Sequence, residues 1–381
     1  MSRVDGKQKN WGSRSGRATK KPKKEEQSNA DKLINNGLSH EMLELAASDP
    51  TEFQTIAQKI LEKRNTIAEE AMKQTLKKVF STKLGTLYNT DCIKLLKTKI
   101  EDGSIDCVFA DPPFNLSKNY GKGVKDSIKE EDYLEWTRLW LDLCCDKLKD
   151  GGSLFVYNIP RWGSYIASYL NQRLSFRNWI TVDLTLSMPI PNKLYPSHYS
   201  LLYYVKGGRP NHFSPPRLPL KTCIRCGQEQ NDYGGYKMKM NPEGLNLRDV
   251  WTDIPPVRHK KHKSRDANEL SLKLMDRVVE LSTKRGDLVF DPFGGAGTTF
   301  VASELAGRKW IGAELGDCTP IVERFNNLDN DKENLKKYRA NLNTLFTDKD
   351  ILNRYKHGLK LDNYKISREQ IDRALPENDL F

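Results

Sequence analysis

The order of hydrophobic and polar positions divides the chain into segments with different periods. Between residues 29 and 80 apolar side chains recur at helical spacing, and Pro50 interrupts the run, so at least two helices are predicted there. From about residue 84 the pattern changes to short β-rich runs at 86–88 and 105–110, with a helical run at 92–99 between them. Strands that alternate with helices are typical of parallel α/β units.

The same alternation continues along the chain. A helical run, 133–148, stops at Gly151 and Gly152 and precedes further apolar runs, which predict a strand at 153–158, a helix at 167–174, and strands at 179–186 and 198–206. After an irregular segment the pattern resumes with a helix at 268–283, a strand at 288–291, a helix from 298 and a strand at 309–315. We therefore predict a doubly wound, mostly parallel sheet of Rossmann-like α/β type.

This pattern also sets the expected domain boundaries. Residues 84–206 and 266–320 form the predicted α/β domain, and four further segments surround it: a disordered basic arm at 1–28, a helical extension at 29–83, an insert at 207–265, and a polar helical extension at 321–381. The arm is rich in Lys, Arg, Gly and Ser and has too few apolar residues to order itself.

The net charge of the chain indicates which kind of partner it binds. The chain has 381 residues and a formal net charge of +12, which favours a polyanion such as nucleic acid over a basic surface kept only for solubility. No apolar stretch approaches the length of a membrane span, and the N-terminus does not resemble a signal peptide. Seven cysteines, an odd number, do not suggest a disulfide framework, so we expect a reducing cytoplasm.

A glycine-rich turn between two predicted strands has the pattern of a ligand site. Asp291 ends the first strand, glycines 294, 295 and 297 follow, and Glu314 ends the second strand. Doubly wound folds place a carboxylate at that point to accept hydrogen bonds from ribose hydroxyls. The Gly-Lys-Ser/Thr ending of a phosphate-binding loop is missing and position 299 is Thr, so S-adenosylmethionine fits this turn better than NAD.

A second unusual strand end is the sequence Asp111-Pro112-Pro113-Phe114. Proline fixes φ, lacks an N–H donor and disfavours helical geometry in the preceding residue, so main-chain groups near Asp111 and Pro112 are acceptors. An acid and a carbonyl could then hold both hydrogens of one exocyclic amino group and favour its attack on a methyl group. Phe114 offers a face on which a flipped-out base can stack, a contact typically worth about 1–3 kcal/mol.

With these two motifs, the chain resembles the S-adenosylmethionine-dependent DNA amino-methyltransferases of bacteria and phages. Asp-Pro-Pro-Phe resembles their catalytic motif, and residues 291–299 resemble their cofactor motif. The catalytic motif comes first, which is the order of the permuted β subgroup, and the resemblance covers roughly residues 84–320. The insert then corresponds to the target-recognition domain of that subgroup.

The resemblance implies roles for individual residues. Asp111, Pro112, Pro113 and Phe114 would hold the target base, with Tyr199 as either a wall of the base pocket or a core residue. The implied cofactor residues are Asp91, Cys92, Asp111, Asp291, Phe293, Gly294, Gly295, Gly297, Thr298 and Glu314. Many relatives carry a His-Pro-x-x-Lys-Pro turn that this chain lacks; Asn268 and Glu269 are candidates to take over its cofactor contacts.

The insert contributes two further sets of candidates. Its basic residues are the expected DNA contacts: Lys237, Lys239, Arg248, Arg258, Lys260, Lys261, Lys263 and Arg265. Cys223 and Cys226 have the spacing of a zinc knuckle, and His259 and His262 follow at a distance longer than in a compact finger. A structural zinc is therefore one interpretation, and a pair of small apolar side chains is the other.

The resemblance implies a site-specific enzyme that methylates N6 of a flipped-out adenine in double-stranded DNA, because Asp-Pro-Pro is commoner in adenine members. Cytosine N4 is the alternative, followed by structured RNA and by a catalytically silent DNA-binding protein. The resemblance also implies a homodimer and a restriction–modification or epigenetic setting, with a cognate restriction endonuclease left open.

Overall fold

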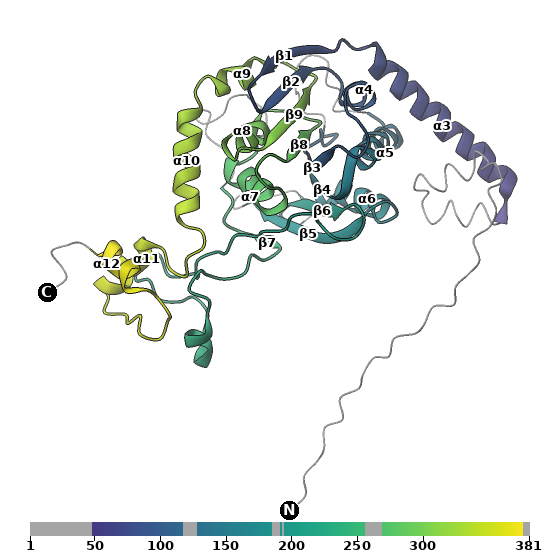
Figure 1. Cartoon of the computed structure of the whole chain (residues 1–381). Coiled ribbons are helices and arrows are strands. Elements are labelled where there is room, and N and C mark those ends of the chain that lie inside the picture. The colour runs from purple at the N-terminus through teal and green to yellow at the C-terminus, as the bar shows by residue number, and fades with distance from the viewer. Residues whose placement is uncertain (1–47, 117–127, 185–190, 193, 256–268, 376–381) are drawn as a thin grey trace, which may run out of the picture.

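The computed structural model describes residues 48–116, 128–184, 191–192, 194–255 and 269–375. Its main body is one large sheet with helices on both faces, and a smaller group of segments is set apart at the end of a long helix (Figure 1). Within the described ranges, no helix combines the length and the apolar character that crossing a membrane requires. The predicted arm at 1–28 lies outside the described residues.

The sheet of the described residues has nine strands in the order β1-β2-β9-β8-β3-β4-β6-β5-β7. Their bounds are β1 Lys77–Ser81, β2 Gly85–Asn89, β3 Ile105–Ala110, β4 Leu148–Asn158, β5 Ser175–Asp183, β6 His198–Val205, β7 Val250–Trp251, β8 Leu288–Asp291 and β9 Lys309–Glu314. Strands β1 and β6 run antiparallel to their neighbours, and the remaining strands run parallel to one another. The predicted mostly parallel sheet is confirmed.

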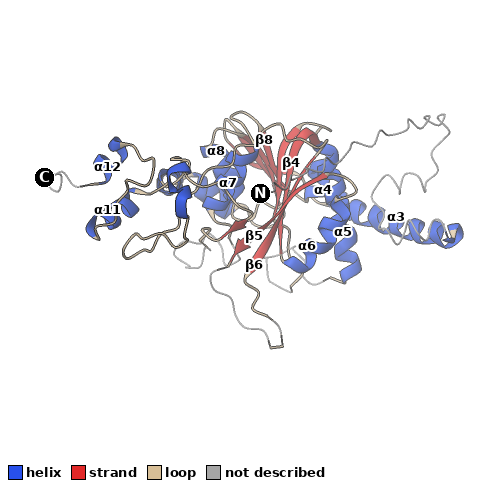
Figure 2. Ribbon diagram, turned by 90° about the horizontal axis from the view of Figure 1, so that it is seen from below, coloured by secondary structure: helices blue, strands red, loops and turns tan. Residues whose placement is uncertain are grey.

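Helices cover both faces of the sheet, as a doubly wound fold requires (Figure 2). One face carries α4 Cys92–Thr98, α5 Glu130–Lys147 and α6 Pro160–Leu170, and the other carries α7 Leu272–Ser282 and α8 Thr298–Leu305. Because both faces are covered, the central strand β3 is an almost continuous apolar run with five of its six residues buried. Phe109, Phe155 and Phe290, from neighbouring strands, are fully buried at the centre of this core.

Several predicted elements differ from the structure. The helix expected to stop at Gly151 and Gly152 ends at Lys147, and both glycines lie inside β4, which begins at Leu148. The helical expectation for residues 77–80 is wrong: they form β1, an edge strand in which Phe80 packs against Phe325 at a ring-centroid distance of 5.0 Å. The helix expected at 167–174 is α6, which begins earlier because Pro160 occupies its first turn, where no N–H partner is needed. After Leu170 the chain turns into β5.

The N-terminal helix α3, Pro50–Lys73, packs only its C-terminal half on the main body (Figure 1). Asp49 caps its first turn by accepting hydrogen bonds from Thr51 N and Glu52 N at 3.1 and 3.0 Å. Arg64 joins it to α5 through ion pairs of 2.8 Å with Glu135 and 3.3 Å with Asp142. These half-buried pairs fix the angle at which the helix leaves the domain.

The C-terminal segment is helical, as predicted, and continues as α9 Thr319–Phe325, α10 Leu328–Ala340, α11 Asp348–Lys356 and α12 Arg368–Ala374. Its last part shares a second hydrophobic core with the insert, which contains the short 3-10 helix η1, Gly234–Lys239. The members of this core are Leu220, Leu345, Phe346, Ile351 and Tyr364. We call residues 217–249 and 341–375 together the composite lobe; it lies at the far end of α10 (Figure 1).

Candidate active site

The parallel strands end along the same edge of the sheet, and their carboxyl ends bring the predicted acids together there. This edge consists of strand ends and is not an outer strand. Asp111 follows β3 directly, Asp291 ends β8 and Glu314 ends β9. Strand β2 pairs with β9 so that Asn89 lies opposite Glu314, which places the turn containing Asp91 at the same edge. In open α/β sheets this edge is where ligands bind.

The glycine loop between β8 and α8 is shaped by close contacts that exclude side chains. A Cβ atom on Gly294 would lie 2.8 Å from the ring of Phe300 and 3.1 Å from the Ala313 carbonyl oxygen. Gly297 has φ of +73° and stands directly before the first residue of α8. Both positions therefore need glycine, which lets the backbone turn tightly directly before α8.

Carboxylates hold this loop from both sides. Glu314 Oε2 accepts a 2.6 Å hydrogen bond from Gly295 N, and its Oε1 accepts one of 2.7 Å from Gly316 N. Asp291, which is 1% exposed, accepts from Phe293 N at 2.8 Å. The loop conformation is thus fixed before any ligand arrives.

The neighbouring turn at 89–92 is held in a similar way. Asn89 Nδ2 donates to the carbonyl oxygens of Glu314 and Gly316 at 2.8 and 2.9 Å, and Asp91 caps α4 by accepting from Ile93 N at 2.8 Å. Burial raises the pKa of the Asp91 carboxyl. Cys92 is buried in the hydrophobic core, so its side chain contributes packing beneath the turn.

Arg324, on α9, is a residue of this site that the sequence did not reveal. Its guanidinium donates to Thr298 Oγ1 at 2.9 Å and to the Ala296 carbonyl at 3.2 Å, and it lies 3.2 Å from Glu269 in an ion pair. Thr298 and Glu269, both predicted near the cofactor, therefore meet at this arginine. Asn268, the other residue predicted with Glu269, lies outside the described residues.

The Asp111–Phe114 loop is anchored through its carbonyl groups. The Tyr133 hydroxyl, from α5, donates to the Pro113 carbonyl at 2.8 Å, and Trp162 Nε1, from α6, donates to the Phe114 carbonyl at 2.7 Å. Tyr133 and Trp162 are both 2% exposed. Two buried side chains thus hold the loop through the carbonyls of Pro113 and Phe114, and neither was predicted.

Aromatic rings form a wall beside Asp111. Phe114 lies 5.7 Å from Tyr199, and Tyr199 lies 4.9 Å from Tyr157, measured between ring centroids. Burial raises the pKa of both tyrosines, and the nearby charge of Asp111 raises it further. The wall reading of Tyr199 agrees with this placement, and Tyr157 extends the wall.

A chain of rings connects the two motifs. Tyr133 packs on Trp162 at 4.7 Å and on Trp136 at 5.7 Å, and Trp136 packs on Phe293 at 5.6 Å. Phe293 belongs to the glycine loop, whereas Trp162 holds the Asp111–Phe114 loop. The helical spacing of residues 133 and 136 in α5 signals a shared face, although it could not show what that face touches.

Asn115 closes the loop on its other side. Its φ is +53°, a left-handed conformation that asparagine adopts more readily than most residues. The amide donates to the Ile128 carbonyl at 2.9 Å and accepts from Ile128 N at 2.9 Å. These two bonds hold Ile128, which precedes α5, next to Asn115.

The predicted DNA contacts in the insert are only partly within the described residues. Lys237 is paired with Glu229 at 3.4 Å and so has a structural partner, whereas Lys239 and Arg248 are exposed. Arg258, Lys260, Lys261, Lys263 and Arg265 lie outside the described residues.

The predicted zinc ligands are also divided. His259 and His262 lie outside the described residues, and within the described ranges no group of three or more possible ligand side chains is found. Hydrogen bonds from the backbone N–H groups of Cys226 and Arg225, followed by the Cys226 thiol, lower the pKa of Cys223. Backbone donors around one sulfur suit a thiolate ligand, so the cysteine half of the site fits zinc, and the complete site stays a prediction.

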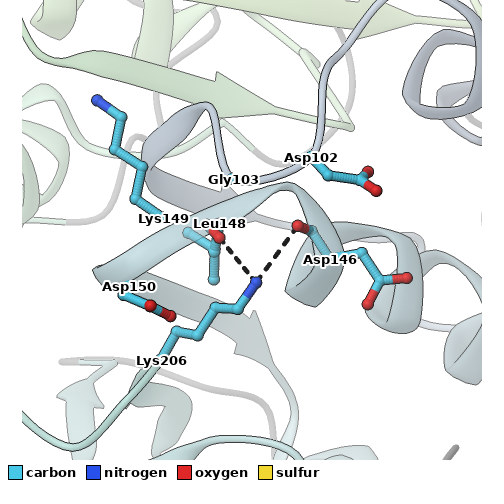
Figure 3. A pocket seen from close by; sticks show the side chains of 7 residues that line it. All are labelled: Asp102, Gly103, Asp146, Leu148, Lys149, Asp150 and Lys206. Carbon is cyan, nitrogen blue, oxygen red and sulfur yellow. Dashed lines mark hydrogen bonds between the residues drawn. The ribbon is translucent and has the colours of Figure 1, made fainter.

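A hollow of about 680 Å³ lies elsewhere on the domain, at the opposite edge of the sheet (Figure 3). Its lining consists of Asp102, Gly103, Asp146, Leu148, Lys149, Asp150 and Lys206. Lys206 donates to the carbonyls of Cys145 and Leu148, each at 2.8 Å. These main-chain bonds fix the lysine in the lining of the hollow. Because Leu148 begins β4 and Asp111 follows the end of β3, this hollow is separate from the candidate active site.

Comparison with known proteins gives a family and close relatives. Residues 105–318 match a protein family described as DNA methylase. The chain is 53% identical over 306 residues to Type II methyltransferase M.BamHI of Bacillus amyloliquefaciens, an alignment that covers 80% of this chain and 72% of that protein. It is 28% identical over 293 residues to Type II methyltransferase M.HpaI of Haemophilus parainfluenzae, covering 74% and 88%.

Among solved structures, PvuII DNA methyltransferase (cytosine-N4-specific) is similar with a TM-score of 0.49 and 18% sequence identity. That alignment covers 70% of this chain and 95% of the PvuII chain.

Proposed function

Because this chain belongs to the DNA methylase family, we propose that it transfers a methyl group from S-adenosylmethionine to an exocyclic amino group of a base in double-stranded DNA. The observation that carries the proposal is the anchored Asp111–Phe114 loop, at the same sheet edge as the glycine loop. The family resemblance inferred from the two motifs is confirmed by the family match and by the 53% identical relative.

The anchored loop suits the chemistry of an amino group. An exocyclic amine on a base is a weak nucleophile because its lone pair is delocalised into the ring. Tyr133 and Trp162 fix the Pro113 and Phe114 carbonyls, and in this proposal the Asp111 carboxylate and the Pro112 carbonyl accept the amine hydrogens. Two fixed acceptors orient the amine and favour a tetrahedral nitrogen, and the Asp111 carboxylate can hold the proton that the nitrogen loses.

The aromatic wall suits a base that has left the duplex. Phe114, Tyr199 and Tyr157 lie in contact beside Asp111, and a flipped-out base stacks on such rings. Stacking restricts the base to a plane, so that its amino group meets the acceptors in one orientation. The wall therefore contributes both affinity and alignment.

The glycine loop and its neighbours suit S-adenosylmethionine. Glu314 would accept hydrogen bonds from the ribose hydroxyls, and the tight turn at Gly294 and Gly297 would lie beside the cofactor. Asp91, partly buried at the neighbouring turn, would lie beside the adenosine. When bound, S-adenosylmethionine supplies an electrophilic methyl group, and the residues of this chain orient the amine toward it.

We also propose which base carries the amino group that is methylated. Adenine N6 is our first expectation, from Asp-Pro-Pro, and cytosine N4 is the alternative, because both amines present the same two hydrogens to Asp111 and Pro112. We also propose that the enzyme recognises a short DNA sequence, serves a restriction–modification or epigenetic system, and acts in the cytoplasm at the nucleoid.

The test incubates the purified chain with methyl-labelled S-adenosylmethionine and, in separate reactions, a duplex DNA of diverse sequence and a structured RNA, and then identifies the labelled nucleoside. N6-methyl-2′-deoxyadenosine or N4-methyl-2′-deoxycytidine from the DNA supports the proposal and decides the base. Label in RNA and none in DNA would contradict it. Asp111→Ala should abolish transfer and leave cofactor binding measurable by calorimetry, whereas more than about a tenth of the wild-type rate would contradict the role of Asp111.

A further inference from the structure

We propose that the C-terminal segment is part of the DNA-binding surface: α11 and the insert turn 223–226 form one face of the composite lobe that contacts the phosphate backbone of duplex DNA. This inference rests on the proposed function. It adds residues 341–375 to the surface that the sequence assigned to the insert alone.

The two segments of the lobe share one core. Leu220 comes from the insert, and Leu345, Phe346, Ile351 and Tyr364 come from the C-terminal segment. Main-chain hydrogen bonds join them: Leu220 N donates to Leu345 O at 2.8 Å, and Asn343 N donates to Arg217 O at 3.0 Å. The insert supplies only one of the five buried residues, so the C-terminal segment holds the insert in place and positions whatever the insert binds.

Arg354, on α11, is the central polar joint of the lobe. Only 3% exposed, it donates to Gly227 O and to Lys360 O, each at 2.9 Å, and lies 3.3 Å from Glu229 in an ion pair. Tyr364 donates to the same glutamate. Burial alone would raise the pKa of Glu229, but the hydrogen bonds and charge of Tyr364 and Arg354 lower it to about 2. These contacts fix α11 against residues 227–229.

The same helix presents cations beside the insert turn. Asn353 Nδ2 donates to the Ile224 carbonyl at 3.1 Å, which seats the turn on α11. Lys349 and Lys356 lie one helical turn on either side of Asn353, at positions that share its face. Both lysines and Arg225 are exposed. The face therefore combines cations from two distant parts of the sequence.

The acids of the lobe near this face are already engaged. Asp348 is paired with Arg373 at 2.9 Å, and Asp350 accepts from Thr222 Oγ1 at 2.6 Å. In the part of the chain that the structure describes, Lys349, Lys356 and Arg225 have no acidic partner within ion-pair distance. A face with exposed cations, beside which Asp348 is ion-paired and Asp350 is held by Thr222, suits a polyanion, and duplex DNA is the polyanion that the proposed function supplies.

The lobe is joined to the edge of the sheet that carries Asp111. The insert returns to the sheet as β7, which pairs in parallel with the end of β5, so its direction leads to that edge. Trp251 is buried there under the Arg277 guanidinium at 4.9 Å, and Asp253 holds Arg277 through bonds of 3.0 and 2.6 Å. A duplex bound by the lobe can thus extend to the site where its base would be held.

The test compares variants of the full chain for equilibrium binding to a duplex over a range of salt concentrations. Each lost phosphate contact should reduce the slope of log affinity against log salt by about 0.9, so Lys349→Gln with Lys356→Gln should reduce it by about 1.8 and Arg225→Gln by about 0.9. The control is Lys59→Gln with Lys97→Gln, which removes the same charge from exposed positions on α3 and α4. The control should keep the wild-type slope.

The results separate this inference from the proposed function. If the α11 variant keeps the wild-type slope, or if the control loses as much, the inference is overturned while methyl transfer by the wild type still supports the function. If wild type transfers no methyl group to DNA but the α11 variant alone loses slope, the surface stands and the proposed function fails. Cofactor binding by calorimetry should be unchanged in every variant, since none of these residues lies at the glycine loop.

Discussion

Trp162→Phe tests whether the Asp111–Phe114 loop must be held for transfer to occur. The substitution keeps an aromatic ring to pack on Tyr133 and removes one donor, Nε1, which lies 2.7 Å from the Phe114 carbonyl. Trp162 is 2% and Phe114 is 5% exposed, so water does not readily replace the lost bond. The carbonyl must then remain unsatisfied or the loop must move.

An unsatisfied buried acceptor costs about 1–3 kcal/mol. If the loop moves to regain a hydrogen-bond partner, Asp111 and Pro112 are displaced and the amino group is misaligned. The free-energy cost then appears as a higher barrier to methyl transfer. At about 1.36 kcal/mol per tenfold change, the transfer rate constant should fall about 5- to 150-fold. Cofactor affinity should fall less than the transfer rate constant, because among the described residues no ring contact or hydrogen bond joins Trp162 to the glycine loop directly.

The assay is single-turnover methyl transfer at saturating DNA, with cofactor binding by calorimetry and unfolding by denaturant on the same variants. The matched control is Trp251→Phe, which removes a buried indole donor 2.7 Å from the Arg248 carbonyl, in the connection to the composite lobe. It should lose stability and keep the wild-type rate constant. If Trp162→Phe also loses only stability, the loop does not need this anchor and the reasoning is refuted.

Three further predictions concern other parts of the chain. Gly297→Ala forces a side chain into φ of +73° and within 2.7 Å of Ile321, so cofactor affinity measured by calorimetry should fall; Gly358→Ala, at φ of +67° with nothing within 4 Å, should leave it intact. Glu229, with its pKa near 2, stabilises the composite lobe above about pH 4.3, and this stability should disappear between pH 4.3 and 2. Near-ultraviolet circular dichroism follows that loss, and Glu229→Gln should remove this part of the pH dependence. If wild type and Glu229→Gln lose the signal over the same pH range, the role of Glu229 is refuted. Purified protein from zinc-supplemented cultures should hold about one zinc, lost in Cys223→Ser, and less than about 0.2 equivalents would contradict the zinc prediction.

The central sheet could be predicted because its strands are covered on both faces. Residues 105–110 form an apolar run that only Asp106 interrupts, for that reason. The next helix and strand were also recognised, although β4 begins at Leu148 and includes Gly151 and Gly152. The edge strand at 77–81 could not be recognised, because it has one partner strand and mixes exposed lysines with two half-buried apolar residues. Its pattern is compatible with the end of a helix.

The acids of the site were predictable for a related reason. Asp111, Asp291 and Glu314 each end a strand, and parallel strands bring their ends to one edge. Trp162, Asn115 and Arg324 were not predictable, because each acts on a group that is distant in sequence or on a main-chain atom. Trp162, for example, reaches a carbonyl 48 residues away.

The composite lobe was missed because neither of its segments has a pattern of its own. The insert supplies only Leu220 to the buried core, with a few half-buried apolar residues around it, and so it reads as an irregular segment. The C-terminal helices have more charged than apolar positions and so read as a solvated extension. Only the contact between them turns both into a folded unit.

The position of the base relative to the cofactor is set by packed side chains and not by the loops themselves. Methyl transfer requires the nitrogen and the methyl carbon to be aligned closely, and both belong to ligands held on loops. The Pro113 carbonyl is fixed by Tyr133, whose ring packs on Trp136, and Trp136 packs on Phe293 of the glycine loop. Because all three rings belong to buried or half-buried side chains on one helix and the loop it faces, a displacement of either loop must disturb this packing. The aromatic chain therefore provides the rigidity that the two glycine- and proline-rich loops lack.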